Sequence, residues 1–110
     1  MKDRQLLKIV REFRAGILGR DPSIFQCFKV CAPLAGFLKM YGVDAALKEG
    51  IVKLRDEEGR YAGECNHFWL ELPDARVIDP TADQFNRRLG LKMPPIYLGA
   101  PTAELHASCG

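Results

Sequence analysis

No stretch of the 110 residues is both long enough and apolar enough to span a membrane. The opening segment MKDRQLLKIVREFR carries charges that interrupt any signal-peptide core. The sequence also lacks internal repeats and low-complexity segments. We therefore expect one folded domain over residues 1–110, located in the cytoplasm and with no membrane partner.

Net charge is also scarce, a formal +2 at pH 7, and the composition of 47% hydrophobic and 27% charged residues is ordinary for a globular protein. The charge is uneven, because residues 1–20 hold six Lys or Arg and two acids, a net +4, which leaves −2 for the rest. No aromatic residues interleave with these charges in the manner of a nucleic-acid platform. We interpret the basic segment as a solvated helix face and do not expect nucleic acid as a partner.

Two helices are predicted in the first half of the chain. Apolar residues recur at helical spacing at Leu6, Val10, Phe13 and Ile17, and this helix should end near Gly19. Residues 21–23 (DPS) indicate a turn or helix start. The second pattern ends at Gly42 and comprises Cys27, Cys31, Leu34, Leu38 and Tyr41. Because Pro33 fits only the first turn of a helix, the regular part should start a few residues before it, with Cys27 and Cys31 near the N-terminus.

The alternation typical of β-strands follows. Residues 43–54 predict a strand or a bent pair of strands, and DEEG at 56–59 predicts a turn. HFWLEL at 67–72 alternates cleanly, and after the turn PDA the segment RVID at 76–79 returns as its partner strand. A further short strand is expected at 96–98. Helices followed by an antiparallel sheet make an α+β fold.

The register of this hairpin decides which side chains meet. Pairing across the three-residue turn that buries Leu70 against Ile78 puts Trp69 opposite Asp79 on the other face. Asp79 is then the diagonal neighbour of His67, roughly 7–8 Å away between backbones and within side-chain reach. We therefore expect Asp79 and His67 to be hydrogen-bonded, with Asp83 as the fallback acid.

The four cysteines should be reduced in the cytoplasm, so they are thiols, metal ligands or a nucleophile. Cys27 lies near a predicted helix N-terminus, where backbone N–H groups and the helix dipole favour a thiolate. A histidine is a suitable base for that thiol near pH 7, and an acid beside it fixes its tautomer. Cys27, His67 and Asp79 are therefore the candidate catalytic residues. At a helix terminus beside a cleft, replacing Cys27 by Ala should cost under about 0.5 kcal/mol.

The segments CFKVCAPLAGFLKMYG and NHFWLELPDARVIDPTADQF resemble transglutaminase-like and papain-like cysteine proteins. In that pattern a helix begins at a cysteine and is followed by a glycine. His-x-Trp lies on a strand, and Asp-Pro-Thr ends the next strand. DPTADQF also resembles small bacterial and phage proteins of that fold. The resemblance covers residues 24–86, between an N-terminal helix (1–20) and an irregular tail (87–110).

The resemblance implies that Cys27 is the nucleophile, His67 the base and Asp79 the orienting acid, with the helix packed on a small antiparallel sheet. The implied reaction is attack on an amide, ester or thioester carbonyl of a protein, peptide or small amide, through a thioester acyl-enzyme and without a cofactor. Hydrolysis, deamidation and transfer all stay open. The short chain leaves room for a homo-oligomer that completes the cleft.

The sequence departs from the family before the cysteine, where DPSIF stands in place of a stretch with a glutamine. The backbone N–H of Cys27 supplies one oxyanion donor, and Gln26 and Gln84 are the candidates for the second. Trp69 is a further candidate for contact with substrate.

Two other interpretations remain. In the first, the chain is an inactive binding or regulatory module of the same fold. In the second, it is a zinc-binding domain with the ligands Cys27, Cys31, Cys65 and His67. Reaction of Cys27 with an electrophile at neutral pH distinguishes the first, with Cys31, Cys65 and Cys109 as internal controls. Metal content distinguishes the second.

Overall fold

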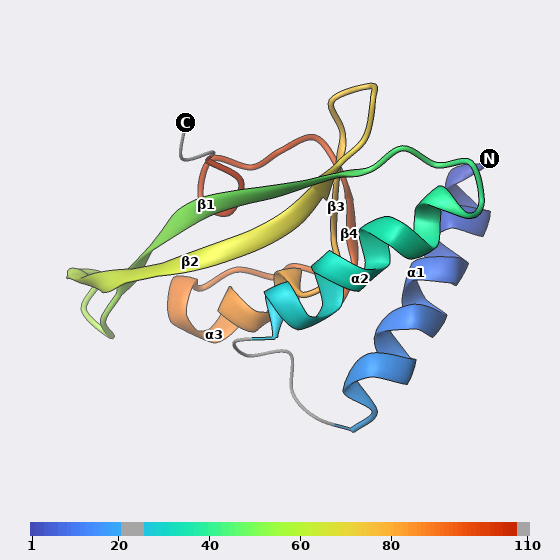
Figure 1. Cartoon of the computed structure of the whole chain (residues 1–110). Coiled ribbons are helices and arrows are strands. Elements are labelled where there is room, and N and C mark those ends of the chain that lie inside the picture. Colours follow the sequence, from blue (N-terminus) through green and yellow to red (C-terminus); the bar gives the residue numbers. More distant parts are fainter. Residues whose placement is uncertain (21–25, 108–110) are drawn as a thin grey trace.

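The computed structural model describes residues 1–20 and 26–107, and within them the chain is an α+β protein with three α-helices, one short 3-10 helix and a four-stranded antiparallel sheet. Its elements are α1 (Asp3–Leu18), α2 (Cys27–Lys39), β1 (Ala46–Arg55), β2 (Tyr61–Glu71), β3 (Val77–Asp79), η1 (Ala82–Phe85), α3 (Asn86–Leu89) and β4 (Tyr97–Gly99). The strands lie in the order β1-β2-β3-β4 (Figure 1). The predicted α+β class is thus confirmed. The predicted turn at 21–23 and Cys109 lie outside the described residues.

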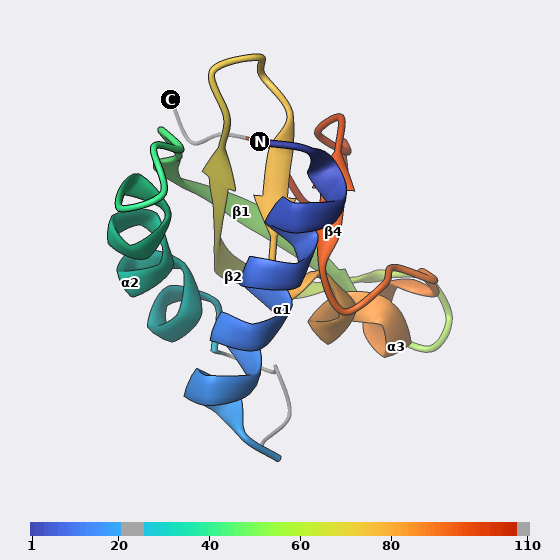
Figure 2. The same cartoon turned by 90° about the vertical axis from the view of Figure 1, so that its right-hand side faces the viewer.

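Helix α1 ends where the apolar spacing predicts. It buries Leu6, Val10 and Leu18 on one face and stops at Gly19, whose φ is 58°. Figure 2 shows α1 over the β3–β4 side of the sheet and α2 beside β2. In the part of the chain that the structure describes, no helix combines the length and the apolar character needed to cross a bilayer.

Helix α2 begins at Cys27, so the predicted N-terminal position of this cysteine is confirmed. The helix continues through Pro33, which is tolerated although its missing N–H leaves the carbonyl of Lys29 without an intrahelical partner. Cys31 therefore lies a full turn inside the helix. The chain turns away at Gly42, with φ of 77°, a conformation that favours glycine.

The hairpin of β2 and β3 has the predicted register. Leu70 pairs with Ile78, and the N–H of Leu72 donates to the carbonyl of Arg76 over 2.8 Å across the three-residue turn. Ala75 in this turn has a φ of 71°. The register puts His67 and Trp69 on one face of β2 and Phe68 and Leu70 on the other.

The β1–β2 hairpin is longer than predicted. β2 begins at Tyr61, six residues before the alternating segment that starts at His67, and β1 pairs with it from Ala46 to Arg55. The turn at 56–59 is confirmed, with the Asp56 carboxylate accepting the N–H groups of Glu58 and Arg60. In this ladder Gly50 lies opposite His67.

Each face of the sheet has its own hydrophobic core. The helix-side core lies under α1 and α2 and consists of Leu6, Val10, Cys31, Leu34, Leu38, Leu70, Leu72 and Ile78. The tail-side core lies on the opposite face and consists of Val52, Leu54, Ala82, Phe85 and Leu105. Cys65 packs at the edge of this second core and lies on the same face of β2 as His67.

The tail predicted as irregular contains more structure than expected. Asn86 closes the loop that follows η1 and α3, because its side-chain amide exchanges two hydrogen bonds with the backbone of Met93 over 2.8 and 2.9 Å. The strand expected at 96–98 is present as β4, one residue later. Residues 100–107, here called the C-terminal segment, run alongside β1 (Figure 1). This segment buries Leu105 and His106.

Candidate active site

The thiol of Cys27 lies at the N-terminus of α2, is only 6% exposed and is hydrogen-bonded to His67. Burial alone would raise the pKa of the thiol. The hydrogen bond with His67, the backbone N–H groups of Phe68 and Phe28 and the charge of His67 outweigh burial, so the net pKa lies below the ordinary value of 9.0. The position therefore favours a thiolate, as the sequence predicts for a helix start.

The edge of β2 beyond the end of β3 is open, and this explains why the thiols of Cys27 and Cys31 both contact the backbone of Phe68 there. Leu72 points its N–H toward β3, so the N–H and C=O of Phe68, an even number of residues earlier, point the same way. The partner position there is Pro80, which follows the last residue of β3 and has no N–H. The Phe68 N–H instead bonds to the thiol of Cys27, and its carbonyl accepts from Cys31 Sγ over 3.5 Å.

His67 lies on β2, fully buried, and its Nε2 is 2.6 Å from Oδ2 of Asp79. The predicted His67–Asp79 hydrogen bond is therefore confirmed. Because Asp79 occupies Nε2, Nδ1 is the nitrogen that faces Cys27. Burial lowers the pKa of His67, but the hydrogen bonds and negative charges of Asp79 and Cys27 outweigh it and raise the pKa to about 9. His67 thus holds its proton at neutral pH.

Asp79 ends β3 and is fully buried, with donors on both carboxylate oxygens. The backbone N–H of Thr81 donates to Oδ1 over 3.2 Å, while His67 and His106 both reach Oδ2. Burial raises the pKa of Asp79, but the hydrogen bonds from His106 and His67 and the charge of His67 outweigh burial and lower it. Asp79 is therefore a buried carboxylate.

His106 is the member of this network that sequence reasoning missed. Its Nε2 is 2.8 Å from Oδ2 of Asp79, although 27 residues separate the two in the chain. His106 lies in a tail with no apolar periodicity, so no spacing connects it with Asp79. The only available sign was the pair Leu105-His106 standing among small and polar residues.

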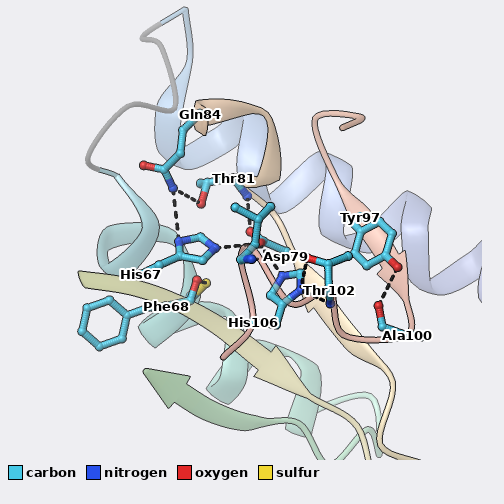
Figure 3. A network of polar contacts seen from close by, with 11 residues as sticks. His67, Phe68, Asp79, Thr81, Gln84, Tyr97, Ala100, Thr102 and His106 are labelled. Carbon is cyan, nitrogen blue, oxygen red and sulfur yellow. Dashed lines mark hydrogen bonds and ion pairs between the residues drawn. The ribbon is translucent and has the colours of Figure 1, made fainter. Parts of the chain in front are cut away.

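The three secondary candidates occupy different places. Gln84, on η1, lies beside the ring of His67, with its Nε2 3.4 Å from Nδ1 and 2.9 Å from Thr81 Oγ1 (Figure 3). Gln26 is the half-buried residue directly before Cys27. Trp69 is 2% exposed, and its ring contacts the rings of His67 and His106. Trp69 therefore packs against both histidines inside the fold, whereas Gln84 lies beside the ring of His67.

Asp83 and the predicted zinc ligands do not form the arrangements that the sequence suggests. Asp83, the fallback acid, pairs with Arg14 of α1 at 3.3 Å. Among the described residues, the only group of three or more potential metal ligands with ligand atoms within 4.8 Å of one another is His67, Asp79 and His106. The structure therefore does not gather the predicted zinc ligands Cys27, Cys31, Cys65 and His67 into one cluster.

A pocket of about 570 Å³ adjoins the site at Gln84 and Cys65. Burial raises the pKa of Cys65, and the negative charge of Cys27 raises it further. Charged side chains of both signs line it, from Arg55, Asp56, Glu57, Arg87 and Arg88.

Side chains from separate parts of the fold thus form one buried hydrogen-bonded chain. Cys27 comes from α2. His67 comes from β2, Asp79 from β3 and His106 from the C-terminal segment (Figure 3). Such a chain can hold a proton on His67 between a thiolate and a carboxylate. Comparison with known proteins adds no family to this description, since no protein-family model, curated protein or solved structure matches the chain.

Proposed function

We propose that this chain is a thiol-dependent hydrolase or acyltransferase with a papain-like or transglutaminase-like core, in which Cys27 is the nucleophile and His67 the acid–base group. The observation that carries the proposal is the continuous hydrogen-bonded chain from Cys27 through His67 to Asp79. A thiol at a helix N-terminus, a buried histidine and a buried carboxylate in this order are the components of an activated cysteine nucleophile.

The protonation states support the same function. The lowered pKa of Cys27 and the pKa of His67 of about 9 both shift the two groups toward a thiolate–imidazolium pair. Asp79 stabilises the imidazolium and fixes the ring, because it holds Nε2 and leaves Nδ1 toward the sulfur. The thiolate is the nucleophilic form of cysteine.

The reaction follows from these states. The Cys27 sulfur attacks the carbonyl carbon of an amide, ester or thioester, a C–S bond forms, and the C=O electron pair moves to oxygen. Collapse breaks the bond to the leaving group, which takes the proton from His67 Nδ1. Water or an amine then attacks the thioester, gives a proton to His67, and the C–S bond breaks to restore the thiolate. The backbone N–H of Cys27 and the amide of Gln84 are the donors proposed for the oxyanion.

Mass mapping of iodoacetamide labelling at pH 7 tests the proposal. We expect Cys27 to be alkylated first, at least tenfold faster than Cys31 or Cys65, because Cys27 is the only one of the three described cysteines with a lowered pKa. His67→Gln should slow labelling of Cys27 by more than tenfold, since glutamine cannot hold a proton for the thiolate. A panel of activated acyl esters then detects a thioester on Cys27 as an added mass.

The matched control is Cys65→Ala, which should leave the labelling rate of Cys27 unchanged. Preferential labelling of Cys31, or equal rates at the three described cysteines, would contradict the proposal. Fast labelling of Cys27 without any acyl transfer would instead favour an inactive binding module of the same fold.

A further inference from the structure

The carboxylate of Asp79 has two histidine donors on the same oxygen. Oδ2 lies 2.6 Å from His67 Nε2 and 2.8 Å from His106 Nε2, and the side chains of all three residues are completely buried. A cysteine–histidine–carboxylate site needs only the first of these contacts. The proposed reaction therefore assigns no role to the second histidine, His106.

The ring of His106 is held from several sides. Its Nδ1 accepts the backbone N–H of Thr102 over 3.0 Å and lies 3.2 Å from Thr102 Oγ1, and its own backbone N–H bonds to the Thr102 carbonyl over 2.8 Å. The ring stacks on Tyr97 at a centroid distance of 5.8 Å (Figure 3). It also meets the ring of Trp69 edge-on at a centroid distance of 5.3 Å. The C-terminal segment thus presents this ring in one orientation.

These contacts also fix the tautomer of His106. A backbone N–H can only donate, so Nδ1 must accept and carries no proton. The ring proton is then on Nε2, where it points at Oδ2 of Asp79. The direction of the bond follows: His106 donates and Asp79 accepts.

We propose that His106 is a positioning residue of the site: by donating from Nε2 to Oδ2 of Asp79, it holds that carboxylate ionised and oriented toward His67. This inference rests on the proposed function, because it assigns His106 a part in the same reaction. Burial disfavours a charged carboxylate, and each donor to its oxygens offsets that cost. The C-terminal segment is then an integral part of the site.

The same three side chains suggest a metal site as the rival explanation. Two ligands of tetrahedral zinc at 2.0–2.1 Å from the metal lie roughly 3.3 Å apart, farther than the two N–O distances of 2.6 and 2.8 Å. Both nitrogens would also need to lose the protons that they direct at Oδ2. Hydrogen bonding therefore accounts for the geometry without a metal.

A pair of substitutions separates the donor from the ring. His106→Phe keeps an aromatic ring against Tyr97 and Trp69 but has no donor, whereas His106→Gln keeps an N–H near the position of Nε2. We expect His106→Phe to slow alkylation of Cys27 at pH 7 by about tenfold, because one charge-assisted hydrogen bond in the network is lost. His106→Gln should stay within about twofold of the wild type, since one donor is retained.

A second readout does not depend on thiol reactivity. In a ¹³C NMR titration, the pKa of the Asp79 carboxyl should be higher in His106→Phe than in the wild type, and His106→Gln should restore it. The titratable groups that contact Asp79 or its partners are the same in all three proteins, namely Cys27 and Cys31 of α2, His67 of β2 and Tyr97 of β4. A purely structural role would lower the melting temperature of both variants without this difference between Phe and Gln.

The wild-type protein supplies the remaining check, which is needed if His106→Phe does not fold. At neutral pH, ¹⁵N NMR of the ring should show Nε2 protonated and Nδ1 unprotonated, and zinc should not raise the melting temperature. A proton on Nδ1, equal Asp79 pKa values in the wild type and His106→Phe, or stabilisation by zinc would each overturn the inference. If Cys27 is unreactive in the wild type while the NMR results hold, the proposed function fails but the His106–Asp79 bond stands; that outcome refutes a role of His106 in catalysis.

Discussion

Cys27 and Cys31 lie four residues apart on α2 and both contact the backbone of Phe68, yet their surroundings differ. Cys31 is fully buried in the helix-side core, and burial, followed by the negative charges of Asp79 and Cys27, raises its pKa well above 9.0. Cys27 has His67 as a partner, and its pKa is lowered. One helical turn therefore separates a thiol with a lowered pKa from a core thiol with a raised pKa.

Burial also changes how much stability the removal of the Cys27 thiol should cost. The sequence predicts a thiol at a cleft that can be replaced cheaply, but Cys27 is only 6% exposed and contacts Phe68. We therefore expect Cys27→Ala to lower the free energy of unfolding by about 1 kcal/mol, since it leaves a void the size of a sulfur atom. Urea unfolding measures this, with the half-buried Cys65→Ala as a control expected to lose less. Equal stability of Cys27→Ala and the wild type would show that the thiol packs against nothing.

Local patterns in the sequence predict the elements that carry Cys27, His67 and Asp79. The apolar spacing of α2 and the alternation of 67–72 depend on neighbours in the chain, and the register follows from burying Leu70 against Ile78. His106 could not be predicted in this way, because its contact with Asp79 joins a strand to a non-periodic segment 27 residues later. Distant, aperiodic contacts of this kind leave no local sign.

Gly50 on β1 is where the C-terminal segment approaches the sheet. A Cβ added there would overlap the carbonyl oxygen of Ala107 and lie 2.6 Å from the Trp69 ring. We expect Gly50→Ala to destabilise the fold by about 1–3 kcal/mol, because two packed groups must move. Urea unfolding should show the opposite sign for Gly36→Ala, a solvent-exposed site in α2 with open space, where a gain of about 0.5–1 kcal/mol is expected. A neutral Gly50→Ala would mean that the C-terminal segment does not pack on β1 in solution.

The candidate site connects the helix-side core and the tail-side core, which lie on opposite faces of the sheet. Cys27 comes from the helix that covers one face of the sheet, and His67 lies on the other face; they meet around the open edge at Phe68. Asp79 is held from the second face by the C-terminal segment. The charges of the site are therefore fixed by packing on both faces, and its titration should be visible in the stability of the entire fold.

Between pH 6.5 and 9 the titrations of His67 and Cys27 should act on stability in opposite directions. The pKa of His67 is raised from 6.5 to about 9, so its contribution is complete below pH 6.5 and is lost as the pH rises toward 9. The pKa of Cys27 is lowered from 9.0, so its contribution is complete above pH 9 and is lost as the pH falls. The lowered pKa of Asp79 acts below 3.8, outside this window. In the wild type, the contribution of Cys27 to the free energy of unfolding opposes that of His67 over this range of pH.

Removing the thiol should therefore expose the titration of His67. In Cys27→Ser, Asp79 still raises the pKa of His67 but the contribution of Cys27 is gone. We therefore expect the free energy of unfolding to fall as the pH rises from 6.5 to 9 by less than about 3 kcal/mol, the equivalent of the full shift of His67. The wild type should fall less over the same range, because thiolate formation at Cys27 opposes the loss. Urea unfolding at intervals of pH measures both curves. Cys27→Ser/His67→Gln is the matched control, since glutamine keeps a donor for Asp79 and does not titrate. A Cys27→Ser curve as flat as that of the double variant would show that Asp79 alone does not outweigh burial, and so does not raise the pKa of His67 once the thiol is gone.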